Sequence, residues 1–169
     1  LWEVDFKNKS MRGPAERMKG SKGKRRSHRV ALSDAAIAVL ERMKRLKAAD
    51  DGYIFPGASG EKPLRNMAMA MLIRGMNEGD NPAWVDAAGE EIVPHGFRSS
   101  ASDWRAEATT YPRDLMEMAL AHAIESKVEA AYRRGDMFDR RRQLMEDWAR
   151  HVTEPAAADN VVSMAEARA

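Results

Sequence analysis

The sequence predicts a mainly α-helical domain with a small antiparallel β-sheet, an α+β fold. Three observations lead to this fold class. Residues 1–6 alternate apolar and polar side chains, as a half-buried strand does. From residue 34 to residue 151, apolar side chains recur at helical spacing in several successive stretches. The chain has 169 residues, 44% of them hydrophobic, which suffices for one domain with one core.

The sheet is expected near the N-terminus. Residues 1–6, 15–19 and 28–32 are the candidate strands, and residues 8–13 are expected to form a turn. Between the second and third strands, residues 20–24 contain two glycines and no large apolar residue, which predicts a hairpin tip.

The remainder is expected to be helical. Ser33 and Asp34 are suited to cap the first helix. Pro112 is placed to begin the fourth. The expected helices cover residues 34–48, 64–78, 95–108, 112–122, 127–134 and 137–151.

Several apolar residues are assigned to the core. In the second helix these are Met67, Met71, Leu72 and Met76, because thioethers pack well in irregular interiors. Trp104 and Trp148 are also expected in the core, whereas His28 and His151 are interpreted as structural residues.

A short buried segment is predicted at 53–57 and a loop at 79–94. The domain is expected to span 1–152, with a C-terminal tail at 153–169.

The charge is unevenly distributed. Residues 1–47 carry a net charge of +9 and residues 48–169 a net charge of −7, within an overall +2. The basic residues concentrate in segment 19–29, which indicates contact with a polyanion such as nucleic acid. The alternative is a solvated basic loop. The candidate DNA-binding residues in this segment are Lys22, Lys24, Arg25 and Arg26.

Composition excludes several classes of protein. No run of apolar residues is long enough to span a membrane, and no secretory signal pattern begins the sequence. The absence of cysteine excludes disulfides and thiolate metal sites, and it agrees with a reducing, cytoplasmic location. Because the first residue is leucine, the chain is expected to be part of a longer protein.

A tyrosine follows a histidine by ten residues late in the chain. Ser126 and Glu129 fit a capping box that begins a short helix, for which Gly135 is the expected left-handed stop. Tyr132 lies near the end of this helix, beside Arg133. Taken alone, such a tyrosine is more typical of a core residue that has its hydroxyl at the rim.

Other polar residues favour phosphoryl transfer with a tyrosine nucleophile. A phenol has a pKa near 10 and needs a partner, such as a neutral histidine, to take its proton. An arginine fork suits the nonbridging oxygens of a phosphate, and a lysine can protonate the leaving alkoxide. The candidates for these roles are Tyr132, His95, His122, Arg98 and Lys19. The sequence contains no metal-binding motif, so neither metal nor cofactor is expected.

At these positions the sequence resembles the tyrosine recombinases, and within them the prophage and genomic-island integrases of the satellite-phage type. The resemblance rests on His95-Gly96-Phe97-Arg98, Leu120-Ala121-His122 and Ala131-Tyr132-Arg133-Arg134-Gly135, in this order and spacing. Further matches are Glu16-Arg17-Met18-Lys19, His28-Arg29-Val30-Ala31-Leu32-Ser33, Phe55-Pro56-Gly57 and the Arg140–Ala149 segment.

The resemblance implies a role for each residue. Tyr132 would attack the scissile phosphate and form a 3′-phosphotyrosyl link. Arg98 and His122 would bind nonbridging oxygens, and His95 would assist proton transfer around the tyrosine. Lys19 would be the general acid for the 5′-oxygen, with Lys22 or Lys24 as alternatives. Arg133 would contact DNA.

The resemblance also implies the fold and the partners of a recombinase catalytic domain. The partners would be double-stranded DNA at attachment sites and other protomers in a tetrameric synapse, in the bacterial nucleoid. A further active-site arginine of the family is missing from this chain, so weak or no cleavage by this fragment is expected. The alternatives are a non-catalytic DNA-binding or regulatory relative and a metal hydrolase that uses His95 and His122.

Overall fold

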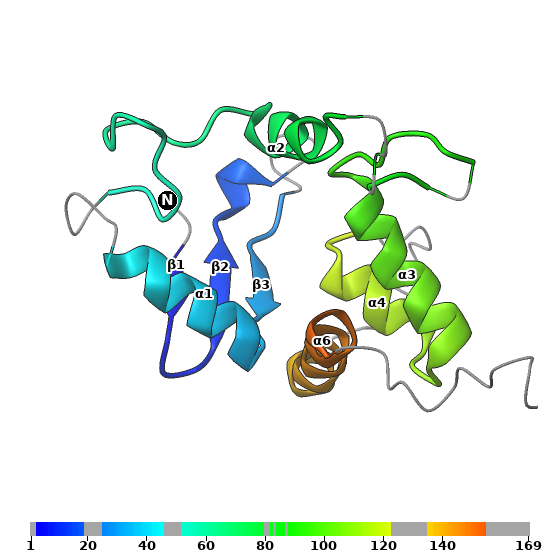
Figure 1. Cartoon of the computed structure of the whole chain (residues 1–169). Coiled ribbons are helices and arrows are strands. Elements are labelled where there is room, and N and C mark those ends of the chain that lie inside the picture. The colour runs from blue at the N-terminus through cyan, green and yellow to red at the C-terminus, as the bar shows by residue number, and fades with distance from the viewer. Residues whose placement is uncertain are drawn as a thin grey trace, which may run out of the picture.

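The computed structural model describes residues 3–18, 25–45, 52–79, 82, 84–86, 88–122 and 135–154. A small sheet and helix α1 form one side of the molecule, and α3, α4 and α6 form the other (Figure 1). Helix α2 lies along one edge, across the ends of the two groups (Figure 1). The predicted combination of helices with a small antiparallel sheet is therefore present.

The sheet has the strand order β1-β2-β3, with both pairs antiparallel. Its strands are β1 (Glu3–Asp5), β2 (Ser10–Gly13) and β3 (His28–Ala31). In the register, Met11 of the central strand lies opposite Val4 on one side and Val30 on the other. The first and third predicted strands are confirmed, but the central strand differs from the prediction.

The central strand was expected at 15–19, and this is wrong. The chain reverses earlier because the Asp5 carboxylate accepts hydrogen bonds from the backbone N–H and side-chain amide of Asn8, at 2.8 and 2.7 Å. The chain can then pair from Ser10 onward, although a turn was predicted at 8–13. Pro14 has no N–H to donate to a ladder and is followed by the 3₁₀ turn η1 (Ala15–Arg17).

Five of the predicted helices are present in the predicted order. Their bounds are α1 (Asp34–Arg45), α2 (Ala68–Met76), α3 (Gly96–Ala108), α4 (Arg113–Ala119) and α6 (Phe138–Thr153). Ser33 begins α1 as expected, because its hydroxyl accepts a hydrogen bond of 3.2 Å from the Ala36 backbone N–H. Two hairpin-like bridges interrupt the stretches between α1 and α3, at Pro56–Pro63 and Val85–Glu91.

The main core lies where α3, α4 and α6 meet. Leu115 of α4 and Leu144 of α6 are fully buried, and Ala101 and Met116 complete the buried cluster. Burying a leucine side chain stabilises a fold by about 1.5–3 kcal/mol, so this contact is a major contribution to stability. Both predicted tryptophans pack against this cluster while remaining partly exposed.

Helix α2 does not contribute the predicted core residues. Ile73 is buried, but Met67, Met71, Leu72 and Met76 are each between 44% and 64% exposed. The helical periodicity predicted one apolar face, but this face is left uncovered by the described residues. The predicted buried segment at 53–57 is also wrong, because the side chains of Tyr53 and Phe55 are 40% and 43% exposed.

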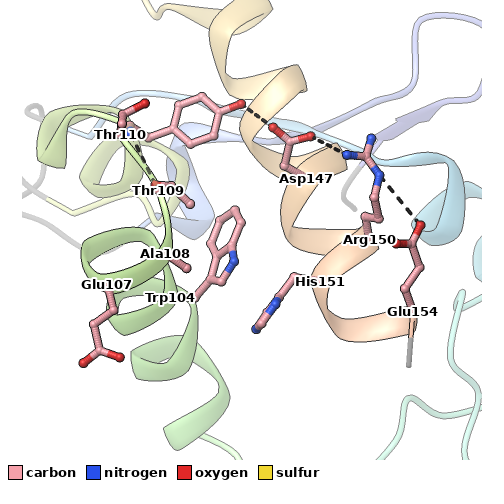
Figure 2. A pocket seen from close by; sticks show the side chains of 10 residues that line it. Trp104, Glu107, Ala108, Thr109, Thr110, Asp147, Arg150, His151 and Glu154 are labelled. Carbon is pink, nitrogen blue, oxygen red and sulfur yellow. Dashed lines mark hydrogen bonds and ion pairs between the residues drawn. The ribbon is translucent and has the colours of Figure 1, made fainter. Parts of the chain in front are cut away.

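The C-terminal ends of α3 and α6 enclose a surface pocket (Figure 2). Trp104 stacks on His151 with 5.6 Å between ring centroids, and Trp148 lies 5.3 Å from Trp104. The Tyr111 hydroxyl donates a 2.5 Å hydrogen bond to Asp147, and burial together with this bond raises the pKa of Tyr111 to about 12. These contacts fasten the end of α6 to α3 and α4.

Other predicted elements lie outside the described residues: the hairpin tip 20–24, the helix 127–134 and the tail from 155 onward. None of the helices in the described ranges combines the length and the apolar character that a membrane crossing requires.

Non-glycine residues adopt left-handed backbone angles on both sides of segment 123–134. Ala121 has φ 55° and Met137 has φ 47°, whereas Gly135, the expected left-handed stop, does not have a positive φ. A residue with a Cβ in this region costs roughly 1–2 kcal/mol relative to the right-handed form. The surrounding contacts must therefore hold both turns in place.

Replacing Ala121 with glycine should relieve this strain and stabilise the protein by about 0.5–1 kcal/mol, or roughly 1–4 °C in melting temperature. Ala106→Gly, at an exposed position inside α3, is the matched control and should instead lower stability by about 1 kcal/mol. Thermal unfolding monitored by circular dichroism measures both. Equal destabilisation by the two substitutions would contradict a strained turn at Ala121.

Candidate functional site

The first turn of α3 carries two of the predicted site residues. His95 immediately precedes the helix and has an exposed side chain. Arg98 lies three residues further on, and its backbone N–H donates a 3.1 Å hydrogen bond to the His95 carbonyl. One helical turn therefore presents an imidazole and a guanidinium close to the positive end of the helix dipole.

Arg98 connects α3 to the turn that follows α4. Its Nε donates a 3.2 Å hydrogen bond to Nε2 of His122, and its Nη2 donates to the backbone carbonyl of Leu120. Leu120 ends α4, and the left-handed Ala121 then turns the chain so that His122 faces the guanidinium. Among the described residues, none accepts a hydrogen bond from Nη1 of Arg98.

A carboxylate on α4 orients His122. Nδ1 of His122 contacts Oε2 of Glu117, and the backbone N–H of His122 donates to the Glu117 carbonyl at 2.9 Å. Because Nε2 accepts a hydrogen bond from Arg98, the neutral ring carries its proton on Nδ1 and donates it to Glu117. The hydrogen bond from His122 is the main reason why the pKa of Glu117 is lowered, and Arg113 at 3.6 Å adds to this effect.

A second histidine lies beside this group. His28 of β3 is partly buried and lies against the backbone of Ala119, near the end of α4. Its Nε2 is buried without a hydrogen-bond partner among the described residues. Burial lowers the pKa of His28, and the charges of Arg141 and Arg98 lower it further. His28 is therefore neutral at physiological pH and links the sheet to the candidate site.

The arrangement is suited to bind an anion and to stabilise additional negative charge. Arg98 supplies a planar cationic fork, and His122, held by Glu117, supplies a ring nitrogen that donates once it is protonated. Within the described ranges there is no group of three or more His, Cys, Asp or Glu side chains that could hold a metal ion.

The structure brings part of the predicted constellation together. Arg98 and His122 are brought together, and His95 lies in the same helical turn as Arg98. Arg25 and Arg26 are exposed, as expected of residues that contact DNA, and Arg25 also donates a 3.1 Å hydrogen bond to the Glu16 carbonyl. Five predicted site residues lie outside the described ranges: Lys19, Lys22, Lys24, Tyr132 and Arg133.

Two residues of this site were not predicted from the sequence. Glu117 lies five residues before His122, a spacing that shares no helical face, and only the turn at Ala121 brings the two side chains together. His28 was interpreted as a structural residue. Its position in the third strand, just after the basic residues of segment 19–26, was the available signal.

The lowered pKa of His28 predicts a pH-dependent stability. Because the folded-state pKa lies below the unfolded value of about 6.5, this contribution is fully present above about pH 6.5. It is lost as the pH falls through the folded-state pKa. His28→Gln cannot be protonated and should lack this loss. Urea unfolding of both proteins at about pH 7.5 and about pH 5.5 measures the difference, and parallel losses of stability would contradict the assignment.

Comparison with known proteins identifies the family. Residues 1–137 match the model of the phage integrase family. The prophage integrase IntA of Escherichia coli (strain K12) is 38% identical over 153 residues, which cover 87% of this chain and 32% of IntA. The prophage integrase IntS of the same organism is 30% identical over 88% of this chain and 35% of IntS.

The integrase of Shigella phage Sf6 is 30% identical over 86% of this chain and 34% of its own length. The chain thus spans about a third of the length of the curated relatives that it matches. No solved structure matches it significantly. The family-model match, which extends over most of the 169 residues and includes both halves of the Arg98–His122 pair, shows that the chain belongs to the phage integrase family.

Proposed function

We propose that this chain is the catalytic domain of a site-specific DNA recombinase that integrates or excises a mobile element. The observation that carries the proposal is the Arg98–His122–Glu117 group, which offers a guanidinium and an oriented imidazole to one anion. The names of the relatives, which are prophage and phage integrases, agree with it. The partners would be double-stranded DNA and further protomers, in a tetrameric assembly.

In the proposed reaction, the Tyr132 oxygen attacks a backbone phosphorus of DNA. A P–O bond forms to the tyrosine while the P–O5′ bond breaks, which leaves a 3′-phosphotyrosine and a 5′-hydroxyl. The phenol proton passes to His95, and Lys19 supplies a proton to the 5′-oxygen. Rejoining is the reverse reaction with a new 5′-hydroxyl. Since the phosphotyrosyl link retains the energy of the broken ester, the exchange needs neither ATP nor a metal ion.

Arg98 and His122 would stabilise the charge that develops on the nonbridging oxygens. An oxygen of the phosphate would replace His122 as the partner of the Arg98 Nε, and His122 would then donate from Nε2 in its protonated form. Glu117 holds the ring in this orientation because its carboxylate accepts the hydrogen bond from Nδ1. The contact of Arg98 with the Leu120 carbonyl would keep the fork in position throughout.

The nucleophile assignment is tested by Tyr132→Phe in the full-length protein. A nicked suicide substrate, which loses the short strand after cleavage, should accumulate a covalent protein–DNA adduct with wild type only. The Phe variant should bind the same DNA with similar affinity, because it loses only a hydroxyl. Denaturing gels measure the adduct and gel shifts measure the binding. An adduct formed equally well by the Phe variant would refute the assignment, and no adduct with wild type would favour a non-catalytic relative.

The role of Arg98 is tested by Arg98→Lys, which retains the charge but removes the planar fork. The rate of adduct formation should fall by about 10²-fold or more, as it does when a preorganised donor to a transition-state oxyanion is lost. Arg105→Lys, two turns further along α3, is the matched control and should leave the rate nearly unchanged. If both variants react at the wild-type rate, Arg98 does not contact the reacting phosphate.

A further inference from the structure

The described chain resumes at Gly135 after segment 123–134, and the residues that follow are fastened to the sheet. The Asp136 carboxylate is bound by Arg29 of β3, whose Nε and Nη2 donate to Oδ2 at 3.2 and 3.1 Å. Nη2 of Arg29 also donates to Oδ1 at 3.4 Å, so the guanidinium binds both carboxylate oxygens.

A buried arginine of α6, Arg141, also binds Asp136. Arg141 is only 2% exposed, and its Nη2 lies 3.2 Å from Oδ2 of Asp136. Its Nε donates a 2.8 Å hydrogen bond to the Asp136 carbonyl, and its Nη1 donates a 2.7 Å hydrogen bond to the carbonyl of Arg29. One guanidinium therefore joins the backbone of β3 to the backbone at the start of α6.

The turn between these groups is closely determined. The backbone N–H of Phe138 donates a 3.2 Å hydrogen bond to Oδ1 of Asp136, which closes an Asx-turn around the left-handed Met137. The Phe138 ring is buried beneath the Arg29 guanidinium, 3.5 Å from the ring centroid. We refer to Asp136, Arg29 and Arg141 together as the α6 latch.

The other end of segment 123–134 is held in a similar manner. There the Arg98 guanidinium binds the Leu120 carbonyl, and Ala121 adopts the left-handed turn. Two consecutive residues of β3 lie at the two ends, since His28 lies against the backbone near the end of α4 and Arg29 belongs to the α6 latch. The same strand therefore fixes the chain on both sides of the segment that carries Tyr132.

We propose that Asp136 is a positioning residue for DNA cleavage. The α6 latch fixes the position of the chain just after Tyr132. It thereby sets how often the phenol oxygen reaches the phosphate held by Arg98. This inference rests on the proposed function, since it requires Tyr132 to be the nucleophile. Asp136 follows Tyr132 by only four residues, so the α6 latch anchors the chain a short distance in sequence after the tyrosine. A displacement of about 1 Å of a reacting group can cost about 10²-fold in rate.

The test compares Asp136→Asn with Asp139→Asn in the full-length protein. Both substitutions remove one carboxylate near the start of α6, but the Asp139 side chain is 99% exposed and reaches Arg142 only at 3.8 Å. Asn at position 136 retains an oxygen for the Phe138 N–H, and Arg141 retains its two backbone carbonyls, so the fold should persist. The readouts are the melting temperature, the Kd for the DNA site and the single-turnover rate of adduct formation on saturating nicked DNA.

For Asp136→Asn we expect adduct formation to be about tenfold slower or more at saturating DNA, with the Kd within about twofold of wild type. Asp139→Asn should match wild type in both. A wild-type rate for Asp136→Asn would overturn the inference, and so would a rate that falls only in proportion to weaker DNA binding or to unfolding. The proposed function fails separately: it is refuted if Tyr132→Phe still forms the adduct, whatever Asp136→Asn does.

Discussion

The burial of the Arg141 guanidinium is the constraint on which the arrangement of the sheet and α6 depends. Removing an ion from water costs several kcal/mol even after relaxation. In this protein the cost is offset by two backbone carbonyls, at 2.7 and 2.8 Å, and by the Asp136 carboxylate. If β3 and α6 separated, Arg141 would lose the carbonyl of Arg29 and Asp136 would lose its ion pair with Arg29, so the two elements are held in one relative position.

The site depends on this position. His28 and Arg29 are neighbours in β3. His28 lies against the chain near the end of α4, and Arg29 binds the chain at the start of α6. The α3–α4–α6 core, centred on Leu115 and Leu144, fixes the opposite side of these helices. The sheet and the core therefore both support the pair formed by Arg98 and His122, although His122 itself lies in the turn after α4.

Five helices and two strands were predictable because periodicity and capping are local properties of the sequence. The central strand was not, because a contact between Asp5 and Asn8 decides where the chain reverses. The exposure of the apolar face of α2 was not predictable either. The spacing of apolar residues in a sequence shows that a helix has an apolar face, but not whether another element covers that face. Within the site, the family resemblance implied that Arg98 and His122 would bind the same phosphate, and the two side chains do meet. The resemblance could not predict Glu117, whose role depends on a turn at a left-handed residue.

The exposed apolar face of α2 has a practical consequence for handling the isolated domain. Met69 and Leu72 are 63% and 64% exposed, and the formal net charge of the whole chain is only +2. Electrostatic repulsion between molecules is therefore weak, while sulfate and similar salts strengthen apolar association. Concentrated samples should be limited by colloidal solubility before they are limited by unfolding, and low-sulfate buffers with a mild detergent are the appropriate choice.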